Sequence, residues 1–224
     1  KRRLIQTLAL EDVERTAPVN LTYLLWRNPE NLKTRSILTL GFNPADSLLL
    51  DEGFSNKSDK LKNPGRVLFD KLSRPEFGPI EDWFLSGKKV ETEVAGKRVI
   101  VEGLVELGPS FGADGNLITS RETFLRLFPA NPKGSIEIGL VKLKTDSNPI
   151  IVSQILNKSL PNDVRILTKN QFIEFEKNYW KNSTAIGFIF SLGALMGFVV
   201  GCVVVYQILY SDVTDHLPEY ATLL

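Results

Sequence analysis

The chain has 224 residues, a formal net charge of +1 and 43% hydrophobic residues. A charge so close to zero provides no excess of basic residues for contacting phosphates, so we expect no nucleic-acid partner. Its one cysteine, Cys202, excludes an internal disulfide, and its one histidine, His216, excludes a histidine-based triad or metal cluster before the apolar run near the C-terminus. Because the chain begins at Lys1 and its only methionine is Met196, we expect a fragment or a processed chain.

The first part of the chain consists of short apolar and alternating runs separated by turn residues. These runs predict a short helix, three strands and one polar surface loop. They are Arg2 to Leu10 (helix), Val13 to Trp26, Thr34 to Phe42 and Arg66 to Phe69 (strands), and Asp46 to Pro64 (loop). The prolines of SRPEFGP, residues 73–79, forbid a long helix there.

The next part of the chain predicts a hairpin that turns at Ala95-Gly96, followed by shorter elements. The hairpin strands are Lys89 to Val94 and Lys97 to Leu107. Later elements are Leu117 to Thr119 (strand), a helix capped by Ser120 and ending near Phe128, Ser135 to Leu143 (strand), Ile150 to Leu160 (helix) and Val164 to Leu167 (strand). Strands and helices in this order predict an α+β domain over residues 1–168.

A long helix is expected to follow that domain. Thr168 and Gln171 have the spacing of a capping box, in which each side chain caps the backbone N–H of the other residue. No proline occurs from Lys169 to Leu209, so we predict one continuous stalk and transmembrane helix over residues 169–211. Three aromatic residues recur on one side of the stalk, which is therefore expected to pack against the domain: Phe172, Phe175 and Tyr179.

The second part of this helix is predicted to span a membrane. No Asp, Glu, Lys or Arg occurs from Asn182 to Ser211. As a helix, the apolar run from Thr184 to Tyr210 would be roughly 40 Å long, more than the ~30 Å hydrocarbon core of a bilayer. The alternative, a buried helix of a soluble core, rarely lacks charges over so many turns. Aromatic residues near both ends are typical of interfacial anchors: Tyr179, Trp180, Tyr206 and Tyr210.

Small residues recur every fourth position along the apolar run. They form two ridges: Gly193, Gly197 and Gly201, and Ser183, Gly187 and Ser191. Ridges of this kind let two helices approach closely, so we expect the span to pack against other transmembrane helices. The alternative is that the glycines are merely tolerated in lipid.

Motifs of catalysis or cofactor binding do not occur in the sequence. There is no GxxxxGK[ST] pattern, and GADGN at 112–116 lacks the spacing of an EF-hand or a dinucleotide site, which favours a tight turn. His216 with Asp212 and Asp215 could in principle hold a metal, but solvated residues after a membrane span are the simpler interpretation. Four glutamates of the hairpin are explained better by protection of sheet edges than by a glycosidase-type pair: Glu91, Glu93, Glu102 and Glu106. We expect no catalytic residue, cofactor or metal.

Five long strings resemble the DevC-like branch of MacB/FtsX-type ABC transporter permeases, known from cyanobacterial exporters of the DevBCA type. They are SRPEFGPI (73–80), LGPSFGADGNLITS (107–120), LPNDVRILTK (160–169), FIEFEKNYWKNSTAIGFIF (172–190) and YQILYSDVTDHLPEYATL (206–223). The last string resembles the start of the cytoplasmic segment that follows the second transmembrane helix in that family.

The resemblance implies a non-catalytic permease subunit with four transmembrane helices, of which this chain contains the second. It implies a MacB-like periplasmic domain, with residues 1–181 outside and 212–224 in the cytoplasm of an inner-membrane protein. The implied partners are a separate ABC ATPase, a periplasmic adaptor (membrane fusion protein), a TolC-like outer-membrane channel and a second copy of the chain, with a glycolipid or similar cargo. The implied ATPase-coupling residues are Asp212, Val213, Asp215, His216, Leu217, Pro218 and Glu219.

The orientation and two other functions stay open at this point. Lys177 and Lys181 precede the span while Asp212, Asp215 and Glu219 follow it, and the positive-inside rule would favour the reverse orientation. A single-span sensor or receptor with an extracytoplasmic ligand-binding domain is the first alternative, and it would carry a signalling domain beyond Leu224. A membrane-tethered hydrolase is the second, and it would need a nucleophile–base pair.

Overall fold

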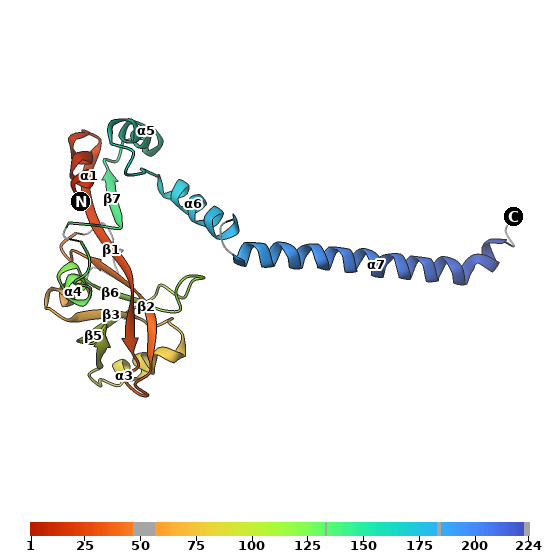
Figure 1. The fold of residues 1–224 in the computed structure, drawn as a ribbon, viewed down its shortest axis with the longest axis horizontal. Coiled ribbons are helices and arrows are strands. Elements are labelled where there is room, and N and C mark those ends of the chain that lie inside the picture. The colour runs from red at the N-terminus through yellow and green to blue at the C-terminus, as the bar shows by residue number, and fades with distance from the viewer. Residues whose placement is uncertain (47–56, 133, 183–184, 222–224) are drawn as a thin grey trace. The chain divides into compact units, whose positions relative to one another are not determined.

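The structure, a computed structural model, describes residues 1–46, 57–132, 134–182 and 185–221. The chain divides into two compact units, Lys1–Val164 and Arg165–Leu224. The first unit mixes strands and helices, and the second is helical (Figure 1). The predicted α+β domain followed by a long apolar helix is confirmed.

The described part of the first unit contains seven strands. They are β1 (Val13–Arg27), β2 (Thr34–Phe42), β3 (Arg66–Asp70), β4 (Glu91–Val94), β5 (Lys97–Val105), β6 (Asn116–Ser120) and β7 (Ile138–Leu143). Their order is β2-β6-β3-β5-β4-β1-β7, and β1 also pairs with β2, so six strands close into a ring. β1 is long enough to serve three partners, because residues 13–19 pair with β7, residues 20–27 pair with β2, and Trp26 pairs with Val94 of β4. Closure pairs strand edges that an open sheet would leave free.

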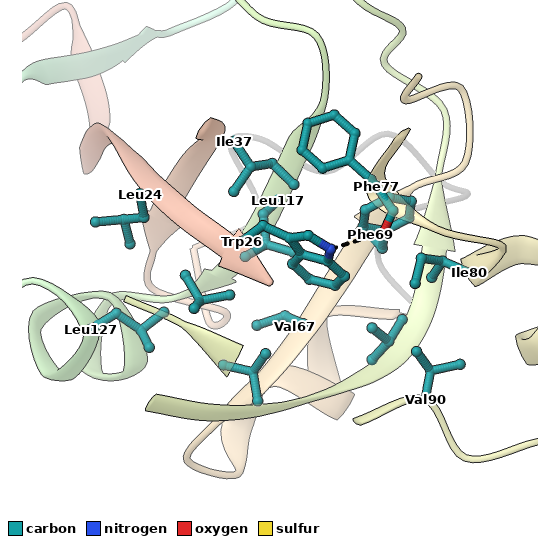
Figure 2. Packing of buried hydrophobic residues seen from close by; sticks show 13 residues of the cluster. Leu24, Trp26, Ile37, Val67, Phe69, Phe77, Ile80, Val90, Leu117 and Leu127 are labelled. Carbon is teal, nitrogen blue, oxygen red and sulfur yellow. Dashed lines mark hydrogen bonds between the residues drawn. The ribbon is translucent and has the colours of Figure 1, made fainter. Parts of the chain in front are cut away.

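The main core lies inside this ring around Trp26, which is fully buried (Figure 2). The indole N–H of Trp26 donates a hydrogen bond to the carbonyl oxygen of Phe77 at 3.0 Å, so its one polar group is satisfied. The Trp26 ring also packs 5.1 Å from the ring of Phe69, centroid to centroid. The buried members of the cluster are Leu24, Trp26, Ile37, Val67, Phe69, Phe77, Ile80, Val90, Val94, Val99, Val101, Leu117 and Leu127.

Short helices precede, connect and follow the strands. They are α1 (Arg2–Gln6), η1 (Thr7–Ala9), η3 (Asp59–Lys62), η4 (Pro75–Phe77), α3 (Ile80–Leu85), α4 (Arg121–Leu127) and α5 (Pro149–Ser159). The predicted cap of α4 is confirmed, because the Ser120 hydroxyl accepts a hydrogen bond from the Thr123 N–H at 3.2 Å. The predicted hairpin turn is confirmed too: Ala95 and Gly96 both have positive φ, as a tight two-residue hairpin turn requires.

Three local predictions are corrected by the structure. Residues 164–167, expected to be a strand, form no strand and pair with no other strand. Residues 135–137, expected to begin a strand, precede β7, which starts at Ile138. α3 was not expected, because the prolines near it predict a helix break. Pro79 precedes its first turn, where a missing N–H costs nothing.

The polar stretch Asp46 to Pro64, expected to be a surface loop, includes part of the core. Residues 47–56 lie outside the described residues, but η3 is helical and its Leu61 is fully buried. Leu61 completes a second cluster with Phe42, Leu68, Val105 and Ile118. Among the described residues of this segment, Leu61 packs into that cluster, and the ammonium groups of Lys57 and Lys60 donate hydrogen bonds to carbonyl oxygens of β5.

The second unit consists of α6 (Lys169–Asn182) and α7 (Ala185–Ala221). Both correspond to the predicted stalk and transmembrane helix, and its continuity at Ser183 and Thr184 falls outside the described residues. In a straight helix, residues six apart are separated by about 9 Å along the axis. A Cβ atom on Gly187 would instead collide with the carbonyl oxygen of Lys181, so the end of α6 lies against the first turn of α7. Gly187 permits this approach because it has no side chain.

Candidate functional site: the capped helix and the apolar span

The start of α6 is fixed by the predicted capping box. The Gln171 N–H donates to the Thr168 hydroxyl at 3.3 Å, and the Thr168 N–H donates to the Gln171 side-chain oxygen at 2.9 Å. The Phe172 N–H donates to the Thr168 carbonyl oxygen at 2.9 Å and begins the helical ladder. Backbone N–H groups at the start of a helix would otherwise lack acceptors, so these hydrogen bonds set where α6 begins.

The aromatic side of α6 is half exposed. Phe172 and Phe175 are each 43% exposed and Tyr179 is 51% exposed. The guanidinium carbon of Arg165 lies 5.2 Å from the centre of the Phe175 ring, a cation–π contact. The Tyr179 and Trp180 rings meet edge to face at 6.0 Å. That this side packs against the α+β domain stays a prediction.

The apolar part of α7 has the length and composition of a membrane span. The candidate span covers Gly187–Thr214, with a mean hydropathy of 2.5 in its most apolar window, and none of that window is buried. That this helix crosses a membrane stays a prediction. Near its end, the Tyr206 and Tyr210 rings stack at 6.0 Å.

The glycine ridge of α7 is open. A Cβ atom placed on Gly193, Gly197 or Gly201 would meet nothing within 4 Å. Ser191 continues this helix, whereas Gly187 faces the end of α6, so the second ridge does not present one uniform surface. Space over three successive glycines is the geometry that lets another helix approach closely.

The segment after the span continues the same helix as far as Ala221. Asp212 and Val213 are exposed on it, and the Thr214 hydroxyl donates to the Tyr210 carbonyl oxygen at 2.7 Å. The side chains of the other predicted coupling residues lie outside the described residues: Asp215, His216, Leu217, Pro218 and Glu219. The helix therefore extends beyond its expected end near residue 211 by nearly three turns, at about 3.6 residues per turn.

Titratable side chains of the first unit form ion pairs. Asp114, in the GADGN segment, binds Arg35 at 2.5 Å and Arg74 at 2.8 Å, and the hydrogen bond from Arg35 lowers the pKa of Asp114. Hydrogen bonds from Lys89 and Lys71 lower the pKa of Glu91 and of Glu106, respectively. Among the described residues, no three His, Cys, Asp or Glu side chains are grouped as metal ligands.

One buried carboxylate was missed at the level of sequence. Asp70, fully buried at the end of β3, accepts hydrogen bonds from four donors. They are the N–H groups of Leu72 (3.2 Å), Leu107 (3.0 Å) and Gly108 (2.9 Å) and the side-chain amide of Asn116 (2.8 Å). Asp70 therefore joins the segment after β3 to both ends of the connection between β5 and β6. A lone aspartate after a strand was the available signal, but it does not reveal partners so distant in the sequence.

No protein-family model and no curated protein sequence matches this chain. Solved structures do match at low identity. The extracellular domain of the noncanonic ABC-type transporter YknZ from Gram-positive bacteria is 12% identical, with a TM-score of 0.49, covering 75% of this chain and 88% of that one. The periplasmic region of MacB from Actinobacillus actinomycetemcomitans is 13% identical, with a TM-score of 0.49, covering 79% and 82%. These likenesses are weak, so the function proposed below rests on the chain's own residues.

Proposed function

We propose that this chain is part of the permease subunit of a MacB/FtsX-type ABC exporter of the DevC-like branch. The observation that carries the proposal is a capped helix followed by an unburied candidate span of 28 residues, directly after an α+β domain. This is the order of elements that the sequence resemblance implies. In the proposal the chain is non-catalytic, residues 1–181 are periplasmic, and residues 212–224 reach the cytoplasm.

The proposed partners follow from the same resemblance. A separate ATPase binds on the cytoplasmic side at Asp212–Glu219, and a second copy of the subunit packs in the membrane on the open ridge of Gly193, Gly197 and Gly201. A periplasmic adaptor connects the subunit to a TolC-like channel in the outer membrane. The proposed cargo is a glycolipid or a similar lipid.

The two helices suggest how ATP hydrolysis is coupled to the periplasmic domain. Closure of the ATPases displaces the end of α7, and the displacement reaches α6 through the contact between Gly187 and Lys181. A helix transmits such a displacement only while its hydrogen-bond ladder is intact. Insertion of Pro-Gly after Asn178 in the full-length subunit is therefore expected to leave ATP hydrolysis active but to abolish export. Unchanged export would refute the coupling role of α6.

Co-purification tests the proposed class of protein directly. The full-length subunit, extracted in mild detergent, is expected to retain an ABC ATPase and an adaptor encoded by neighbouring genes. Deletion of residues 212–224 should release the ATPase and leave the adaptor bound. Retention of a kinase-like or other signalling partner in place of an ATPase would favour the single-span sensor instead.

A further inference from the structure

A cavity of about 710 Å³ opens on the α+β domain, and the described residues that line it belong to the first unit. Its walls come from α1, from the first half of β1, from the segment after β2 and from the start of α4. The volume is in the range of small-molecule sites, roughly 300–1,000 Å³. The cavity lies near the point where the part of β1 that pairs with β7 ends and the part that pairs with β2 begins. Elements distant in the sequence therefore meet around it.

Lys1 and other polar residues also line this cavity, but most of its exposed surface comes from apolar walls. They include Leu4, Ile5, Pro18, Pro44 and Leu125. Ile5 is 56% exposed, although a side chain of this size is usually buried. A wall of this composition favours a ligand with a hydrocarbon part, because apolar surface gains free energy when it leaves water.

Arg121 adds a positive charge to the apolar walls. Its Nε–H donates to the side-chain oxygen of Asn20 at 3.1 Å. Asn20 is fully buried and donates in turn to the Ser135 carbonyl oxygen at 3.2 Å and to the Glu137 carboxylate at 3.0 Å. These bonds hold the guanidinium in one orientation and leave its terminal N–H groups for other acceptors.

Arg121 is half buried and has no ion pair among the described residues. The Glu137 carboxylate is engaged by Asn20 and by the Leu21 N–H instead. Asp46 and Glu122 also line the cavity, and neither lies within ion-pair distance of Arg121. Lys62, a further lining residue, is paired with Asp59 at 2.7 Å. A half-buried guanidinium without a carboxylate partner is a binding group for a carboxylate or phosphate.

We propose that this cavity binds an amphipathic molecule with one anionic group, the anion on Arg121 and the hydrocarbon chain against Leu4, Ile5 and Leu125. The inference is independent of the proposed transport function, because it concerns only the first unit. If the subunit exports a lipid, this cavity is a candidate contact for that cargo.

Photolabelling tests the site in the whole chain, embedded in phosphatidylcholine nanodiscs. The probe is myristate carrying a diazirine on its chain, and labelled peptides are identified by mass spectrometry. We expect label in the peptides that contain Ile5 and Leu125, in addition to label in α7 from probe dissolved in the bilayer. Excess myristate should compete with the label at Ile5 and Leu125, whereas tetradecanol and sodium phosphate should not.

Variants test the role assigned to Arg121. Arg121→Gln should weaken competition by myristate about tenfold, since a hydrogen bond to a charged group contributes about 1.5–3 kcal/mol. Arg121→Lys should retain most of the competition by myristate, because it keeps the positive charge. Ala45→Trp, at an exposed position of the lining, should reduce labelling by filling the cavity. Arg98→Gln is the matched control, because Arg98 is exposed and pairs with Glu91 outside the cavity.

Three results would overturn the proposal. They are label confined to α7, equal competition by tetradecanol, and competition by sodium phosphate alone. Label confined to α7 would mean that the cavity binds no amphiphile. Equal competition by tetradecanol would mean that Arg121 selects no anion, and competition by sodium phosphate alone would mean that the site binds a free anion. Near-ultraviolet circular dichroism of each variant shows whether the domain is folded. None of these results affects the co-purification test of the proposed function.

Discussion

At the scale of single residues, Asp70 joins the segment after β3 to the connection between β5 and β6. Its carboxylate is fully buried and accepts four hydrogen bonds, from three segments of the chain. A buried charge is costly unless it is paired or fully hydrogen-bonded, and Asp70 meets the second condition. The segment with Phe111 at its tip, 75% exposed, is held at its base by these bonds.

Asp70→Asn is expected to lower the free energy of unfolding of the domain by about 2–3 kcal/mol. The amide keeps one acceptor oxygen and turns a donor toward a backbone N–H, which then lacks a partner. Urea unfolding of the whole chain in detergent, followed by tryptophan fluorescence, measures the change. Asp59→Asn serves as the control, because Asp59 is exposed and pairs with the exposed Lys62, and it should change stability by less than about 0.5 kcal/mol. Equal effects of both substitutions would contradict the role of Asp70.

Asp114 makes the stability of the domain depend on pH. The hydrogen bond from Arg35 lowers its pKa below the ordinary value of 3.8, with further help from the charge of Arg74. The unfolded chain therefore takes up a proton at a higher pH than the folded chain does. The stabilisation is complete above the ordinary pKa and is lost as pH falls through the lowered one.

The melting temperature of the wild-type chain should therefore fall more steeply between pH 5 and pH 2, roughly the window of a lowered aspartate pKa, than that of Asp114→Asn. At neutral pH the variant should be the less stable of the two, because it has lost the ion pairs. Thermal unfolding at several pH values checks both statements. Parallel pH profiles for the two proteins would show that Asp114 is not the responsible group.

At the scale of elements, the beginning of α6 shows how local sequence specifies structure. The capping box satisfies donors at the helix start with side chains three residues apart, so no distant contact is needed. The end of α6 is different in kind. It depends on the close approach of Lys181 and Gly187, and no capping residue in the sequence predicts that approach.

Thr168→Ala is expected to destabilise the first turn of α6 by about 1 kcal/mol, because the N–H of Gln171 loses its acceptor. Amide hydrogen exchange at Gln171 and Phe172 should then be about five times faster, and exchange in the middle of α7 should not change. Thr168→Ser is the matched variant, since it keeps the hydroxyl and should exchange as the wild type does. Equal exchange in the alanine and serine variants would argue against the cap.

At the scale of the whole molecule, the proposed function depends on whether the apolar part of α7 crosses a membrane. Position 202, the site of the single cysteine, lies inside the candidate span. This placement allows a labelling experiment with native chemistry. A thiol in the hydrocarbon core is out of reach of a charged maleimide.

In intact membranes, Cys202 should not react with a membrane-impermeant maleimide, and it should react once the chain is unfolded in sodium dodecyl sulfate. In a Cys202→Ser background, Lys181→Cys should react from the periplasmic side. Asp212→Cys should react only after the membrane is made permeable. The reverse pattern would mean that the positive-inside rule, and not the resemblance, describes the orientation.

The sequence by itself determined the elements whose signals are local. The alternation of β1 and β2, the Ala95-Gly96 turn, the Ser120 cap, the capping box of α6 and the charge-free run of α7 each depend on residues within a few positions of one another. Only the tertiary structure decided the closed ring, the buried Asp70, the place of Leu61 in the core, the meeting of α6 and α7 at Gly187, and the cavity beside Arg121. Each of these needs contacts between segments distant in the sequence, and a period of apolar residues carries no information about which partner a side chain will meet.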